Sequence, residues 1–100
     1  MQPILYFCNK TPAITDLIGD FGDRLQLMNK AGRHGLRLAL AGKVYGFECD
    51  IYSSAVLLSD IAEDVLGDPG HDSHPELPDV LAILDKISST EALKLIAFTT

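Results

Sequence analysis

Apolar and polar positions alternate along residues 36–51, and this pattern predicts a β-hairpin. The alternating apolar positions are Leu36, Leu38, Leu40, Tyr45, Phe47, Cys49 and Ile51. Gly42-Lys43 stands between the two halves and suits a two-residue turn with glycine first. In that register apolar side chains meet on one face, and Arg37 lies opposite Glu48 on the other.

Two further apolar runs predict strands near the ends of the chain. Ile4–Cys8 is a short, β-favouring run closed by Asn9. Residues 93–100 alternate and end in Phe-Thr-Thr, so we favour a terminal strand there, with a helix as the alternative.

Between these runs the spacing predicts three helices. Thr11-Pro12 begins the first, whose apolar face extends to Met28 and which Gly32 can cap. Ser53 or Ser54 begins the second, which stops at Gly67. Pro78-Asp79 begins the third, which ends near Ser88. Ser88-Ser89-Thr90-Glu91 then resembles another helix start.

The predicted order of elements is β-α-β-β-α-α-β. This is a split βαβ, ferredoxin-like plan with the 36–51 hairpin at its centre, in one α+β domain spanning residues 1–100. The alternative is a hairpin plus helices with a helical C-terminus. Such a fold hosts many unrelated functions, so it does not identify an activity.

Charge is strongly segregated along the chain. Residues 44–85 contain ten carboxylates and no lysine or arginine, whereas residues 1–43 carry a net charge of +3. The whole chain has a net charge of −6 and a pI near 4.7. Because phosphate binding needs clustered lysine and arginine, this balance argues against direct binding to nucleic acid.

Part of the acidic segment opposes local stability. Asp60 and Asp64 form a like-charge pair four residues apart, which costs about 0.2–0.5 kcal/mol. Asp64 and Asp68 lie at the end of a predicted helix, where the dipole disfavours anions. Exposed residues that oppose stability are expected where a surface serves a partner. The predicted partner-binding residues are Asp60, Glu63, Asp64, Asp68, Asp72 and Glu76.

Other candidate chemistry is weak. His71 and His74, with a nearby carboxylate, are residue types that can hold zinc. However, Gly70 and Pro75 oppose a helix that would align the two histidines. We therefore expect a connecting loop without a metal or cofactor. No nucleophile motif is present, so we expect no enzyme. We interpret Cys8 and Cys49 as reduced thiols. The chain also has no apolar run long enough to span a membrane, and together these two features indicate a cytoplasmic protein.

These features predict a non-catalytic binding protein or inhibitor. Its acidic residues 60–76 would dock on a basic, nucleic-acid-binding protein such as a nuclease, as an immunity-type or phage-type inhibitor does, with carboxylates in place of phosphates. The first alternative is an oligomerisation or regulatory module that forms a homodimer through its sheet face, using Tyr45, Phe47, Ile96 and Phe98. The second is a small metal-dependent enzyme using His71 and His74.

Overall fold

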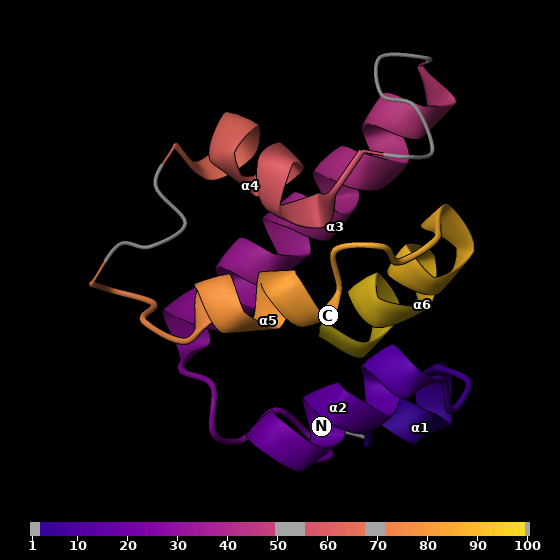
Figure 1. The fold of residues 1–100 in the computed structure, drawn as a ribbon, viewed down its shortest axis with the longest axis vertical. Helices are drawn as coiled ribbons and strands as arrows, with labels where there is room; N and C mark the ends of the chain where they lie inside the picture. The colour runs from indigo at the N-terminus through magenta and orange to yellow at the C-terminus, as the bar shows by residue number, and fades with distance from the viewer. Residues whose placement is uncertain (1–2, 50–55, 68–71, 100) are drawn as a thin grey trace.

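The computed structural model describes residues 3–49, 56–67 and 72–99, and within these residues it contains helices and no strand (Figure 1). In chain order the helices are α1 (Ile4–Phe7), α2 (Pro12–Phe21), α3 (Lys30–Glu48), α4 (Leu58–Leu66), α5 (Leu77–Ile83) and α6 (Ser89–Thr99). The long helix α3 is central and contacts α4, α5 and α6. The ferredoxin-like prediction is therefore wrong.

The predicted 36–51 hairpin is instead the greater part of α3. The Asn29 side chain caps this helix by accepting a hydrogen bond from the Gly32 N–H at 2.7 Å. Gly42-Lys43, the predicted turn, lies inside the helix. The supposed apolar face is split, since Leu36 and Leu40 are buried while Leu38 and Tyr45 are exposed. Ile51 lies outside the described residues.

Small residues on α3 explain why this helix forms the centre of the fold. Its buried residues are Gly32, Gly35, Leu36, Ala39, Leu40, Lys43 and Gly46, which recur every three or four positions as one helix face does. A Cβ added at Gly42 would stand 2.9 Å from Val65 Cγ2, and one at Gly35 would stand 2.8 Å from Leu77 Cδ2. The glycines therefore let α4 and α5 approach the α3 backbone closely.

Both predicted terminal strands are also helical. Ile4 and Cys8 are buried, whereas Leu5 and Tyr6 between them are exposed, which is the spacing of one helical turn and not of a strand. In α6 the buried residues Ala92, Leu95 and Phe98 recur every three positions. Only the helix brings them to one face, and that face contacts α3.

Several helix boundaries predicted from local signals are confirmed. Thr11 Oγ1 accepts from the Ile14 N–H at 3.3 Å at the start of α2, and Ser88 Oγ accepts from the Glu91 N–H at 3.2 Å at the start of α6. Gly67, with φ of 80°, ends α4 as expected. The predicted starts at Ser53 or Ser54 lie outside the described residues, and the described helix begins at Leu58.

The first long helix is shorter than predicted. It ends at Phe21, where Gly22 adopts φ of 92° and its N–H donates to Ile18 O at 2.9 Å. The predicted cap, Gly32, lies inside α3. Leu25 and Met28 are still buried in the core, but from the connection that follows α2.

No described helix could span a membrane. The longest, α3, has 19 residues and is interrupted by charged side chains, and the other described helices are shorter than a bilayer requires.

Candidate protein-docking surface

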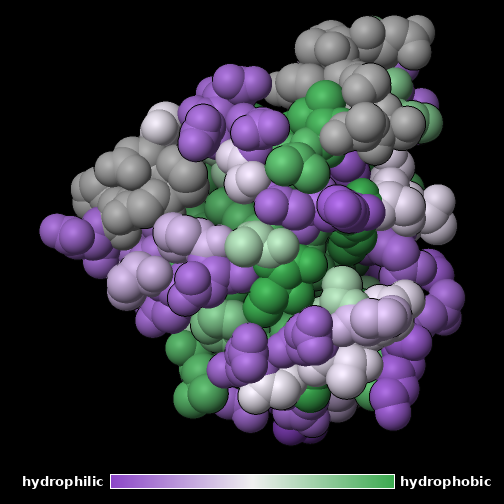
Figure 2. All heavy atoms as spheres, viewed as in Figure 1, coloured by the Kyte–Doolittle hydropathy of each residue, from purple (hydrophilic) through white to green (hydrophobic). Residues whose placement is uncertain are grey.

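Helix α4 presents a row of carboxylates to solvent. Leu58, Ile61 and Ala62 form its buried side. Asp60, Glu63 and Asp64 are exposed on the other side, and we call these three residues the α4 acidic face. In Figure 2 hydrophilic side chains gather over α4, with hydrophobic ones beside them. The helical spacing thus separates the acidic residues from the core.

The position of each carboxylate along α4 decides its effect on the helix. Asp60 lies in the first turn, where the helix dipole favours an anion, so its local effect is better than the sequence suggested. Glu63 and Asp64 lie in the last turn, which contains no basic residue, and there an anion costs about 0.3–1 kcal/mol. Neither Asp60 nor Glu63 forms a salt bridge with a described residue.

The other predicted acidic residues lie elsewhere. Asp72 is exposed before α5, and Glu76 is a partly buried residue at the N-cap of α5. Glu76 Oε2 is buried and has no hydrogen-bond partner among the described residues. Asp68 lies outside the described residues. The structure therefore brings three of the six predicted residues together on one helix face.

The described residues contain no group of three or more side chains suited to a metal ion. His74 is partly buried just before α5, and His71 lies outside the described residues. The segment that contains His74 is anchored to α3, because Asn29 Nδ2 donates to Ser73 O at 2.7 Å.

Exposed apolar side chains lie where α3 crosses α4. Val65 lies beside Gly42, where an added Cβ would stand 2.9 Å from its Cγ2, and it remains 43% exposed. On α3 the flanking Leu38 and Tyr45 are 52% and 66% exposed. We call Leu38, Tyr45 and Val65 the crossing patch. The hairpin prediction hid it by placing Leu38 and Tyr45 on the same sheet face as Leu36 and Leu40, which are buried. The signal that could have revealed it is their seven-residue spacing, which is two helical turns.

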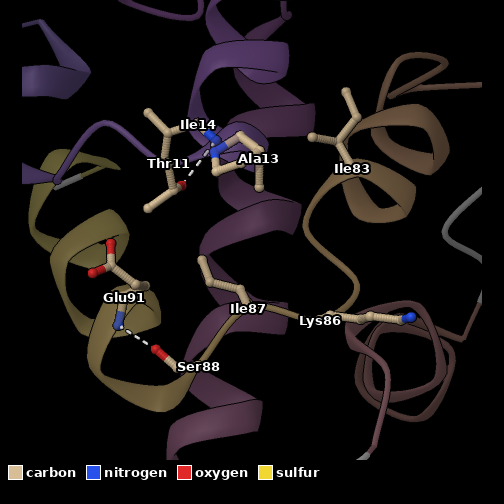
Figure 3. Close-up of a pocket in the computed structure, with 9 residues that line it drawn as sticks. Thr11, Ala13, Ile14, Ile83, Lys86, Ile87, Ser88 and Glu91 are labelled. Carbon is tan, nitrogen blue, oxygen red and sulfur yellow. Dashed lines mark hydrogen bonds between the residues drawn. The ribbon is translucent and has the colours of Figure 1, made fainter.

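A mainly apolar pocket of about 240 Å³ lies between α2, α5 and the start of α6 (Figure 3). Three of its polar side chains take part in helix capping or an ion pair, and the fourth is Lys86. Thr11 and Ser88 cap helices, and Glu91 Oε1 pairs with Lys94 Nζ at 3.3 Å. The pocket thus contains no nucleophile held by a neighbouring base.

Comparison with known proteins found no family model, no curated protein and no solved structure that matches this chain.

Proposed function

We propose that this protein is a non-catalytic binding protein or inhibitor whose α4 acidic face docks on a basic protein partner. The observation that carries the proposal is the exposed row of Asp60, Glu63 and Asp64, two of which lie at the unfavourable end of their helix. A cationic partner would offset that local cost. Asp72 is also exposed, before α5, but the proposed surface is the α4 acidic face.

The crossing patch beside the acidic face supports a protein partner over a simple counter-ion. Interfaces combine a polar, charged rim with a few apolar or aromatic anchors, and tyrosine is common among those anchors. Val65 belongs to the same helix as the carboxylates, and Tyr45 lies across the helix crossing from it. A partner that covers both would bury apolar surface while its lysines and arginines meet the carboxylates.

The partner class follows from charge. A protein that binds nucleic acid already presents a basic surface shaped for anions, so carboxylates on a rigid helix can occupy it. Association would be fast and sensitive to salt, because exposed charges steer the encounter and salt screens them. A nuclease inhibited in this way is our leading candidate, and a cytoplasmic location is part of the proposal.

The test is affinity capture with the purified chain from the source lysate. We compare ionic strengths of about 0.01 M and 0.15 M, at which the screening length falls from about 30 Å to about 8 Å. The variant D60K/E63K reverses two charges of the acidic face. The control D16K/D20K also reverses two exposed charges that lie about one helical turn apart, but on α2.

We expect the native chain and the α2 control to recover the same basic protein at low ionic strength. Less should be recovered at the higher ionic strength and from D60K/E63K. Equal recovery by both variants, or the absence of any basic protein, would contradict the proposal.

Self-association is a second candidate, and the observation that favours it is the exposed crossing patch. The sheet face predicted for this role is absent from the described residues, and Phe98 is buried in the core. Light scattering during size-exclusion chromatography distinguishes self-association from binding of a basic partner. A dimer that persists in high salt and is lost in Y45A favours self-association over binding through the acidic face.

A further inference from the structure

A second cavity, of about 370 Å³, lies between the C-terminal half of α3 and the start of α6. Lys43 and Phe47 of α3 form one part of its lining, and residues 86–90 form the other. Lys86, Ile87 and Ser88 separate it from the apolar pocket of Figure 3 and line both. In that view the Lys86 side chain extends away from Glu91 (Figure 3). The cavity uses no residue of the α4 acidic face.

Lys43 is an unusual lining residue because it is a cation on the buried face of α3. Its side chain is only 5% exposed, and its sole partner among the described residues is Val56 O, which accepts from Nζ at 3.3 Å. An ammonium group has three N–H donors, so two have no partner in the described chain. No described carboxylate balances the charge. Burial accordingly lowers the pKa of Lys43.

The start of α6 adds donors to the same cavity. Ser88 caps this 11-residue helix through its bond with the Glu91 N–H, so the preceding N–H groups of Ser89 and Thr90 have no partner within the helix. The positive end of the helix dipole lies here as well. Ser89 and Thr90 line the cavity, as does the exposed Lys86. Two lysines and the residues that begin α6 thus line one space.

We propose that this cavity binds the phosphate group of a small phosphomonoester. A phosphate monoester carries about −1.5 to −2 charge at neutral pH and three acceptor oxygens, which match two lysines and several N–H and O–H donors. The cavity is large enough for the phosphate and a small organic group. Phe47, 44% exposed on its lining, offers an aromatic surface to that group. Glu91, in the first turn of α6, pairs with Lys94 through Oε1, and its Oε2 is buried without a hydrogen-bond partner among the described residues.

The site is tested by titrating the full chain with inorganic phosphate and with phenyl phosphate at constant ionic strength, using chloride as the reference anion. Calorimetry gives the Kd, and thermal unfolding gives the shift in Tm. We expect both phosphates to raise Tm in a saturable way, with phenyl phosphate binding more tightly because it also contacts Phe47. No binding of either phosphate would overturn the proposal.

Two variants assign the binding to this cavity. K43M removes the buried charge with little change in side-chain length, and K86M removes the exposed one. We expect each to weaken phosphate binding by about tenfold or more, as loss of a charge-assisted hydrogen bond does. K10M removes an exposed lysine outside the cavity and should bind phosphate as the native chain does. Equal binding by K43M, K86M and K10M would also overturn the proposal.

Discussion

Helix α4, which carries the acidic face, packs on α3 at Gly42. Replacing Gly42 with alanine adds one methyl group at this crossing and tests that packing. An ideal Cβ at Gly42 would stand 2.9 Å from Val65 Cγ2 and 3.2 Å from Ile61 Cγ2. Both neighbours are β-branched, so their side chains have few other rotamers available within a helix. In G42A the two helices must therefore separate slightly.

The magnitude follows from two opposing effects. Alanine is favoured over glycine in a helix interior by about 1 kcal/mol, and overpacking costs about 1–3 kcal/mol. We expect G42A to lower the free energy of unfolding by about 0–2 kcal/mol, the difference between these effects. Gly19 in α2 is the matched control, because a Cβ there would meet nothing within 4 Å. G19A should therefore raise the free energy of unfolding by up to about 1 kcal/mol.

The assay is urea unfolding followed by far-UV circular dichroism. The informative quantity is the free energy of unfolding of G19A minus that of G42A. The preference of a helix for alanine over glycine is common to both variants and cancels, so the difference should be about 1–3 kcal/mol, the cost of overpacking. The double variant G42A/V65A should show a positive coupling, because it removes the methyl group that the new Cβ would meet. If G42A stabilises the protein as much as G19A does, α4 does not cross α3 at Gly42.

Other predictions concern the caps, the core and the thiols. T11A removes the side-chain cap of α2 and should cost about 1 kcal/mol of stability, measured by urea unfolding; no loss would contradict the cap. L36A opens a cavity at a fully buried position and should cost about 2–5 kcal/mol, whereas the same change at the exposed Leu38 should cost much less. Burial, assisted by the charge of Glu91, raises the pKa of Cys8 from 9.0 to about 11. The unfolded chain therefore loses this thiol proton first, so the Cys8 contribution to stability is complete below pH 9 and is lost as the pH rises toward about 11. C8A should lack that part of the alkaline decline; an identical decline in C8A would contradict the assignment. In the native protein a thiol reagent near pH 8 should modify the exposed Cys49 and spare Cys8, and equal labelling would show that Cys8 is accessible.

Sequence reasoning located the acidic residues of α4 and their helix, but not the crossing patch beside them. The carboxylates were found because a charge pattern is visible without knowledge of any partner element. Leu38 and Tyr45 were assigned to one face of a hairpin because their alternation with polar residues fits a strand as well as a helix over so few positions. The structure leaves both side chains in solvent on either side of Gly42, where α4 packs on α3.

The cavity at Lys43 could not be foreseen either. In a hairpin turn Lys43 would extend into water, and nothing in the sequence near it indicates a buried cation. Its burial arises because α3 continues as a helix and carries position 43 onto the face that meets the rest of the core. Its proximity to residues 86–90, more than forty positions away, is a consequence of how α3 and α6 contact each other.

By itself the sequence determined the local helix signals: the Thr11-Pro12 start, the Ser88 cap and the glycine stop at Gly67. These depend on hydrogen bonds and backbone angles within a few residues, so they are the same in any fold. Tertiary structure decided whether residues 36–48 and 93–99 are strand or helix. The apolar residues of both segments suit either form, and the form adopted is the one whose apolar side packs against other elements. In α3 the face of small residues packs against α4 and α5. In α6 Leu95 and Phe98 pack in the shared core.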